Sequence, residues 1–375
     1  IAPQNGTGPY NLGDTIIVNI PTRNNLVLVP TESYLKFNFA LKSGAANNIF
    51  RWDNCGAHGL IQRIRVYSGS NLLEDIDSYG LLAHMLFDLQ QPTDACYGKQ
   101  NILCGSRNDV VTQLPSVTAL TAGVIGTYPC DTAANILSAI NALAVTNINT
   151  NIQSVLTASK LSGNQINTGE VLTKTDGTAL LANNDETAVY TYCLNLVSII
   201  GSLCQNNYFP LFACSSAPIR VEIQLVDSIN KAGNALAATI PPTTAQNGYL
   251  QNVEYIANFI ELGDEAMQMI YGSLGGEKLQ FVVPSYKNYP WNYTLANAST
   301  QIAMPIASKF SSLKSLFVTQ RDQGTGAATY FPFSSVKLNI TDYQFRVGSS
   351  ILPAKAPATN TEMFCEVMKA IGSMS

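Results

Sequence analysis

One strand near the middle of the chain constrains the fold more than any other stretch. In residues 219–225 (IRVEIQL), apolar and polar side chains alternate strictly, so the two faces of this strand differ in character. Such alternation is typical of an antiparallel sheet that packs on one side only. A Pro-punctuated aromatic segment, residues 208–212, and a turn of small residues, 214–218, precede the strand. We therefore expect a hairpin whose second strand belongs to a β-sheet that packs on one side only.

The same pattern recurs along the chain and predicts an all-β protein with a few short helices. Strands are predicted at residues 15–20, 26–29, 34–41 and 60–67, and again at 253–262, 279–283, 316–319, 336–340 and 343–347. Apolar residues at helical spacing predict helices at residues 79–89, 189–203 and 361–371. Asp77 or Ser78 is the expected N-cap of the first of these helices, and Asn360 or Thr361 that of the last.

A linker rich in Ala, Thr and Pro at residues 230–247 gives the best domain boundary. It separates a first domain, residues 1–229, from a second, residues 248–375. The order strand, turn, helix recurs in both halves, which suggests two copies of one β domain. Residues from about 105 to 188 are almost free of aromatic side chains, and we interpret them as a long inserted loop with one helix near residues 131–143.

The composition narrows the class of protein. Only 12% of the residues are charged, the net charge is −4 and the pI is about 5.3, which argues against a general nucleic-acid-binding surface. Asn, Thr and Ser supply the polarity instead, as suits a surface largely covered by neighbouring molecules. Eight cysteines without a C-x-x-C pair favour free, buried thiols in a reducing compartment. The most apolar long stretch, residues 192–204, is too short to span a bilayer.

Residues that could carry catalytic or metal chemistry are few, and we predict no catalytic, cofactor-binding or metal-binding site. His58 and His84 have no partners spaced like a zinc site, and we interpret them as a turn histidine and a helix-surface histidine. An acidic cluster is interpreted as a solvated turn before a helix N-terminus: Glu74, Asp75 and Asp77. Four separated arginines are expected to make surface ion pairs or subunit contacts: Arg63, Arg65, Arg220 and Arg346.

Glycine-rich stretches at residues 272–276 and 324–326 lack the strand–helix context and the lysine of a phosphate-binding loop. No G-x-S-x-G motif occurs. The chain is therefore not expected to be an enzyme.

Taken in order, these motifs resemble the double jelly-roll major capsid proteins of tailless icosahedral double-stranded DNA viruses. That lineage includes adenovirus hexon, the virophages, the Polinton-like viruses and the nucleocytoplasmic large DNA viruses. Residues 16–41 resemble the opening strands of the family, and residues 54–82 resemble its next strand pair and short helix. Residues 208–225 resemble the last hairpin of the first roll. In the second half, residues 253–262 and 312–320 resemble strands of the second roll.

The resemblance implies two jelly-roll domains in tandem and a structural role in a capsid shell. It further implies homotrimers that form pseudo-hexagonal capsomers, within a virion assembled after synthesis in the host cytoplasm or nucleus. Partners would be neighbouring capsomers, penton proteins and minor capsid proteins, with an internal membrane as a further candidate and no sequence-specific nucleic-acid binding. No cofactor is implied.

One departure accompanies the resemblance. The second roll should close with its own counterpart of residues 208–225, but no such stretch follows the helix that is predicted to end near Ile371. The second domain is thus expected to lack its last strands. Either residues beyond Ser375 or another polypeptide would supply them, and we favour residues beyond Ser375.

An alternative function is a β-sandwich that binds carbohydrate or acts in adhesion. Three aromatic residues in one short stretch could stack on sugar rings: Tyr286, Tyr289 and Trp291. Binding to glycans that is lost on Trp291→Ala would favour this alternative.

Overall fold

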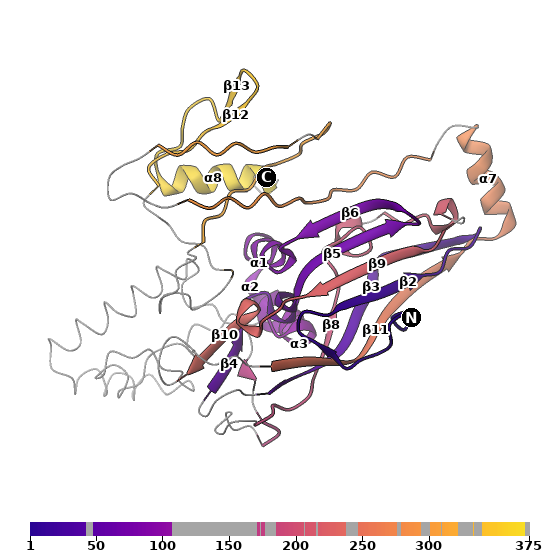
Figure 1. The fold of residues 1–375 in the computed structure, drawn as a ribbon. Helices are drawn as coiled ribbons and strands as arrows, with labels where there is room; N and C mark the ends of the chain where they lie inside the picture. Colours follow the sequence, from indigo (N-terminus) through magenta and orange to yellow (C-terminus); the bar gives the residue numbers. More distant parts are fainter. Residues whose placement is uncertain are drawn as a thin grey trace.

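The computed structural model describes most of the chain outside the long central excursion. The described residues are 1–42, 48–106, 171–172, 174–176, 185–205, 207–214, 217–237, 247–275, 279–293, 301–308, 310–321, 333 and 340–371. They form mostly antiparallel β-sheets with a few short helices (Figure 1).

The first sheet of a β-sandwich contains the strand that most constrained the sequence. β2 (Thr15–Ile20), β9 (Ile219–Leu225), β5 (Ile61–Ser68) and β6 (Asn71–Asp77) lie in the order β2-β9-β5-β6. The apolar positions of β9 are buried and the polar positions are partly exposed, as the alternation predicts. β2 pairs with β9 along its whole length. This pairing of the first long strand with a late strand is typical of a jelly roll. The predicted hairpin is wrong, because β9 lies between β2 and β5 and Phe209 pairs instead with Leu28.

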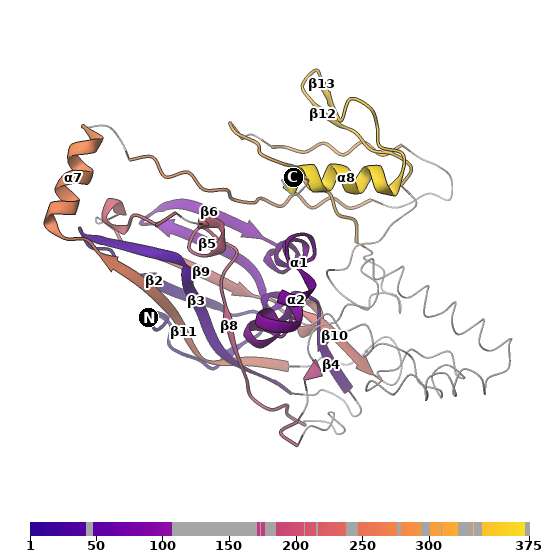
Figure 2. The ribbon, with the colours of Figure 1, turned by 180° about the vertical axis from the view of Figure 1, so that it is seen from behind.

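The second sheet packs behind the first. It contains β1 (Tyr10–Asn11), β11 (Asn247–Glu261), β3 (Leu26–Lys42) and β8 (Tyr190–Leu194), in the order β1-β11-β3-β8. A small third sheet, in the order β10-β4-β7, lies at one end of the sandwich (Figures 1 and 2). Its strands are β10 (Gly233–Ala237), β4 (Asn48–Trp52) and β7 (Val171–Leu172).

The core between the sheets is built on aromatic side chains. Phe39, Phe50 and Tyr192 surround Trp52, with ring centroids 5.1 to 5.9 Å from the indole. The indole N–H of Trp52 donates a hydrogen bond of 2.9 Å to the Tyr192 hydroxyl. Burying so large a polar ring requires such a partner. This cluster ties β3, β4 and β8 together.

Helices and short helical turns lie at both ends of the sandwich (Figure 1). α1 (Tyr79–Gln90) follows the β5–β6 hairpin, and α7 (Asp264–Leu274) follows β11. The short helical elements are η1 (Gly56–Leu60), α2 (Thr93–Ala95), η2 (Cys96–Gln100), α3 (Asn101–Cys104), η4 (Ser202–Cys204), η5 (Leu211–Cys214) and η6 (Ile229–Lys231).

The described residues after α7, 279–371, are called the C-terminal half below. They lie as a layer over the α1 side of the sandwich (Figures 1 and 2). Their regular elements are the hairpin β12 (Phe345–Val347) and β13 (Ser350–Leu352) and the helix α8 (Asn360–Ile371). The Thr359 hydroxyl accepts the N–H of Glu362, and the Glu362 carboxylate accepts the N–H of Thr359. This capping box places the N-cap at Thr359, one residue before the predicted candidates.

Two further sequence predictions about the sandwich were wrong. The predicted helix at 189–203 is instead the strand β8 followed by turns. Residues 190–194 (YTYCL) form this strand because they pair with β3. The predicted strands at 26–29 and 34–41 form one strand, β3. Pro30 is tolerated there because pairing with β11 is irregular at this point. The Ser33 hydroxyl bridges the gap, donating to the Val29 carbonyl at 2.8 Å and accepting the Asn258 N–H at 3.1 Å.

The second half of the chain differs more from its predicted strands. Residues 279–283 and 316–319 run without sheet pairing among the described residues, and the predicted strand at 343–347 is reduced to β12. β11, predicted at 253–262 as the first strand after the linker, pairs with β3 in the sandwich. Residues 336–339 and the predicted helix near 131–143 lie outside the described residues. The division of the chain into two domains stays a prediction.

Candidate functional site at the junction of the two halves

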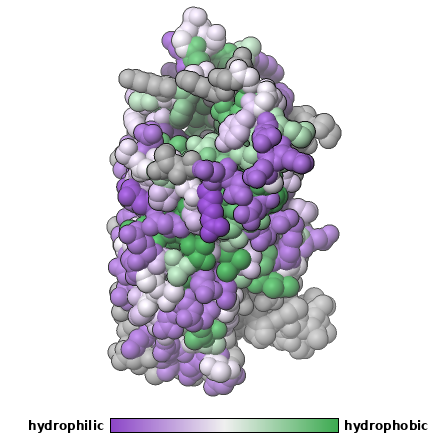
Figure 3. All heavy atoms as spheres, turned by 90° about the vertical axis from the view of Figure 1, so that its right-hand side faces the viewer, coloured by the Kyte–Doolittle hydropathy of each residue, from purple (hydrophilic) through white to green (hydrophobic). Residues whose placement is uncertain are grey.

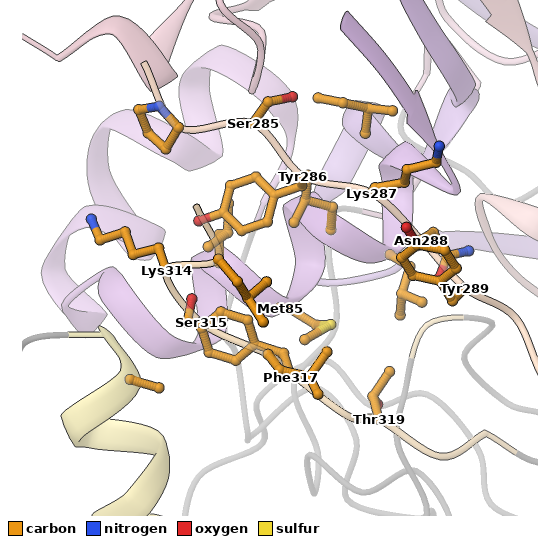
Figure 4. Close-up of a pocket in the computed structure, with 18 of the residues that line it drawn as sticks. Met85, Ser285, Tyr286, Lys287, Asn288, Tyr289, Lys314, Ser315, Phe317 and Thr319 are labelled. Atoms are coloured by element: carbon orange, nitrogen blue, oxygen red, sulfur yellow. The ribbon is translucent and has the colours of Figure 1, made fainter. Parts of the chain in front are cut away.

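A large cavity lies where the C-terminal half meets the sandwich. Its volume is about 1630 Å³, and its walls come from α1, two extended segments (282–289 and 301–319), the β12–β13 hairpin and the end of α8. In Figure 4, Met85 of α1 lies between the two extended segments, which carry Tyr286 and Phe317. The lining is mixed: apolar side chains such as these alternate with polar and charged ones, among them Asp77, Lys287 and Lys314.

The C-terminal half leaves much of its apolar surface uncovered. Val282 is 79% exposed and Phe364 of α8 is 58% exposed. Other large apolar side chains of this half are also exposed: Phe310, Leu313, Val318, Val347, Ile351 and Leu352. Between described residues in 279–321, the extended chain makes no backbone–backbone hydrogen bond. Extended chain that presents so many exposed apolar side chains is a surface that favours association.

The face of the molecule shown in Figure 3 has no single apolar surface, because hydrophilic and hydrophobic residues intermingle on it.

One polar contact between the halves centres on Glu74 of β6. The hydroxyl of Ser285 donates to Glu74 Oε1 at 3.0 Å, and from the sandwich side Ser198 Oγ and the Ile199 N–H donate to Oε2. Burial raises the pKa of Glu74, and these hydrogen bonds oppose the rise. The predicted acidic turn is wrong, because Glu74, Asp75 and Asp77 all lie in the strand β6, and the side chain of Glu74 is buried rather than solvated.

A second contact uses the residue before α1. Ser78 has a left-handed backbone (φ 53°), and its side chain makes no capping hydrogen bond to the helix. Its hydroxyl instead accepts a hydrogen bond of 3.1 Å from the side-chain amide of Asn288. Ser78 is thus the N-cap residue, as predicted, but its side chain does not cap the helix.

A third contact joins Phe333 to a buried ion cluster. The Phe333 N–H donates to Asp53 Oδ2 at 3.0 Å. On the other side, Asp53 Oδ1 lies 3.3 Å from His84 Nδ1, and His84 Nε2 lies 3.2 Å from Asp88 Oδ2. The first of these is an ion pair without the alignment of a hydrogen bond.

His84 was predicted to lie on the surface of its helix, but it is only 4% exposed. Burial alone would lower the pKa of its imidazole, but Asp53 and Asp88 overcome that effect and raise the pKa to about 10. His84 therefore carries a buried positive charge at neutral pH. Its partner Asp53 lies 31 positions earlier in the chain, which is why spacing on the helix did not reveal the burial.

His58 precedes a strand as predicted, but it is also buried. Burial lowers its pKa to about 3, so the ring is neutral. Its Nδ1 lies 2.9 Å from the Tyr79 hydroxyl, which also accepts the N–H of Val197 at 2.9 Å. This arrangement lets Tyr79 donate to His58. The pair joins η1, α1 and the chain after β8 as part of the packed core.

The predicted ion pairs are confirmed for three of the four arginines. Arg63 binds Asp75 through two hydrogen bonds of 2.7 Å. Arg65 and Arg220 each lie 3.3 Å from the carboxylate of Glu222. These pairs lie on the outer face of the sheet that contains β5 and β9, and they keep that face polar.

The described residues offer little chemistry for catalysis or metal binding. Among them, no group of three or more His, Cys, Asp or Glu side chains could hold a metal ion. No described helix is long and apolar enough to cross a membrane. Six described cysteines are free, as predicted: Cys55, Cys104, Cys193, Cys204, Cys214 and Cys365. Burial raises the pKa of Cys55 well above its ordinary value, so this thiol is a poor nucleophile.

The aromatic residues predicted as a sugar-stacking set do not form one exposed face. Trp291 is 45% exposed, and its ring centroid lies 6.2 Å from that of Tyr293. Tyr286 is partly buried and packs against the sandwich core, and it also lines the cavity.

Comparison with known proteins gave matches among solved structures alone. No protein-family model matches the chain, and no curated protein does. The chain is similar to a cryo-EM structure of the Sputnik virophage, with 11% identity, a TM-score of 0.37, and coverage of 68% of this chain and 47% of that one. It is similar to the Faustovirus major capsid protein, with 11% identity, a TM-score of 0.31, and coverage of 73% and 55%.

A third similar structure is VP54 of PBCV-1, fitted into a reconstruction of Sputnik, with 9% identity, a TM-score of 0.29, and coverage of 70% and 42%. These neighbours are viral major capsid proteins. The chain spans about half the length of each of them.

Proposed function

We propose that this chain is a structural protein of a viral capsid. The observation that carries the proposal is the pairing of β2 with β9 in a two-layer sandwich, beside a C-terminal half with many exposed apolar side chains. A jelly-roll sandwich is an architecture of viral shells. Uncovered extended chain and apolar surface suit a protein that is buried by its neighbours.

We further propose that three copies form a pseudo-hexagonal capsomer in the icosahedral shell of a double-stranded DNA virus. This finer statement rests on the order of motifs that resemble the double jelly-roll family. The low charge content supports it, because broad interfaces between capsomers deplete charged residues and use hydrogen bonds of Asn and Thr side chains. The chain would contact neighbouring capsomers, penton proteins and minor capsid proteins in the virion.

Size-exclusion chromatography with light scattering tests the proposal on the polypeptide as its gene encodes it. We expect a stable species with three times the mass of one copy, and rings or hexagonal particles in negative-stain images. A stable monomer at micromolar concentration would contradict the proposal.

The alternative carbohydrate-binding function is tested in parallel on a glycan array. Binding that is lost on Trp291→Ala, together with a monomeric state, would replace the capsid proposal. Trimers without glycan binding would discard the alternative.

A further inference from the structure

Phe333 occupies a socket that two glycines form. The ring lies against Gly59 of η1 and Gly80 of α1, whose backbones are themselves close together. A Cβ added to Gly80 would come within 2.5 Å of Cζ, at the tip of the Phe333 ring. A Cβ added to Gly59 would come within 3.1 Å of Cε2 of the same ring. The ring is 7% exposed, and its centroid lies 6.2 Å from that of His84. The absence of side chains at both positions therefore makes room for this aromatic side chain.

The backbone of Phe333 is fixed at the same place. Its N–H donates to Asp53 Oδ2 at 3.0 Å, and the other oxygen of that carboxylate faces His84. The buried Asp53 carboxylate thus accepts a hydrogen bond from the C-terminal half with Oδ2 and forms an ion pair with the His84 imidazolium through Oδ1. The Asn54 N–H also donates to Asp53 Oδ1 at 2.7 Å. Asp53 is 1% exposed, so its charge depends on these protein partners for compensation, and His84 is the cation among them.

We propose that Phe333 is a latch that fastens the C-terminal half to the sandwich, and that the buried Asp53–His84–Asp88 cluster lets this latch open in alkaline solution. When the imidazolium loses its proton, the Asp53 carboxylate remains buried without a nearby cation. The least costly response is for water to reach Asp53, which requires Phe333 to leave the socket. This inference does not depend on the capsid function.

The groups around His84 define the pH range of the latch. Asp53 and Asp88 face His84 directly, and Cys55 before η1 lies near both carboxylates. Cys104 on α3 and Tyr79 on α1 lie near Cys55, and His58 within η1 lies against Tyr79. Burial keeps His58 and Tyr79 neutral and raises the pKa of Cys55 well above its ordinary value. His84 has a folded-state pKa of about 10 against an unfolded value of 6.5. Its stabilising contribution is thus full below pH 6.5 and is lost as the pH rises through 10.

Gly80→Ala tests the latch selectively. The new methyl group would come within 2.5 Å of the far end of the Phe333 side chain and 3.2 Å of Gly59 Cα. The ring is the closer obstacle and is expected to be displaced, while η1 has to give by only a few tenths of an ångström. Alanine also favours a helix over glycine. The matched control is Gly272→Ala in α7, where an added Cβ meets nothing within 4 Å.

Hydrogen–deuterium exchange of the full chain, corrected for the intrinsic effect of pH, measures the latch at the peptide that contains Phe333. Peptides from β5 and β9 in the same samples report the sandwich. In the wild type we expect protection of the Phe333 peptide to fall about tenfold or more near pH 10, while the β5 and β9 peptides stay protected. Gly80→Ala should show this loss already at pH 7, and Gly272→Ala should behave as the wild type.

Phe333→Ala completes the test as a double-mutant cycle. With the ring gone, adding Gly80→Ala should change the exchange of the C-terminal half little further. His84→Gln should open the latch at pH 7 and abolish the alkaline step. If His84→Gln does not fold, as the β9 peptide would show, the glycine variants and the pH series decide.

Unchanged protection in Gly80→Ala would overturn the proposal. An alkaline loss that appears simultaneously in the β5 and β9 peptides would also overturn it, because it would report unfolding of the whole molecule.

Discussion

The sandwich and the C-terminal half use the same kinds of residue in opposite ways. In the sandwich, alternating strands pair on both sides and bury Phe39, Trp52 and Val221 almost completely. In the C-terminal half, the described segments 279–293, 301–308 and 310–321 are extended but belong to no sheet, and Val282 and Phe364 remain exposed. The difference teaches that an apolar extended sequence becomes a stable sheet only when partner strands are present.

The two halves meet through buried carboxylates as well as through apolar packing, in which Phe281, Tyr286 and Phe333 lie against the sandwich core. Glu74 binds Ser285, and Asp53 binds the Phe333 backbone. Each carboxylate is also held from the sandwich side, so the sandwich provides fixed acceptors on which the C-terminal half docks. Hydrogen bonds to charged acceptors are stronger than neutral ones, so few contacts can hold the second layer.

The largest expected effect comes from making one substitution in both regions. Phe39→Ala removes a fully buried ring that packs 5.2 Å from Trp52, and we expect a loss of about 3–5 kcal/mol in the free energy of unfolding. Phe364→Ala in α8, where the ring is largely exposed, should cost about 0.5 kcal/mol or less. Urea unfolding followed by circular dichroism measures both. Equal losses would mean that Phe364 is covered in solution.

A smaller effect is expected at the junction. Glu74→Ala leaves three donors without their acceptor, namely Ser198 Oγ, the Ile199 N–H and Ser285 Oγ, and should cost about 2–3 kcal/mol. Ser285→Ala removes one bond and should cost about 1 kcal/mol. Thermal unfolding compares the two. If Ser285→Ala is as damaging as Glu74→Ala, the carboxylate serves the C-terminal half alone and the sandwich contacts contribute little.

The same carboxylate gives a pH dependence. Because burial raises the pKa of Glu74, the wild type should lose stability as the pH rises from 4.5 through that raised value. Glu74→Gln should lack this loss. A pH series of urea midpoints measures the difference, and parallel profiles of the two proteins would show that Glu74 does not titrate in this range.

The smallest effect is expected on the outer face of the sandwich. Arg63 donates two hydrogen bonds to Asp75 and so lowers the pKa of that carboxyl. A lowered pKa contributes stability that is present above pH 3.8 and lost as the pH falls through the folded value. Arg63→Gln should cost about 0.2–1 kcal/mol at neutral pH and flatten the acid limb. An unaltered acid limb in Arg63→Gln would assign that limb to other carboxyl groups.

The strands of the sandwich could be predicted from local pattern. Residues 15–20 and 219–225 match β2 and β9 to the residue, because alternation with period two specifies both the conformation and the buried face. The stretch 189–203 misled, because its apolar residues also satisfy helical spacing. Only the neighbouring strand β3, more than 150 positions away, decides that its beginning is a strand.

The junction could not be predicted in the same way. The sequence by itself determined the one-sided strands, the low charge and the free thiols, since these depend on residue type and near neighbours. Tertiary structure alone decided that His84 and Glu74 are buried, and that Asp53 meets both His84 and Phe333. The reason is physical: burial, ion pairing and pKa shifts depend on which distant groups exclude water from a side chain, and local periodicity carries no record of them.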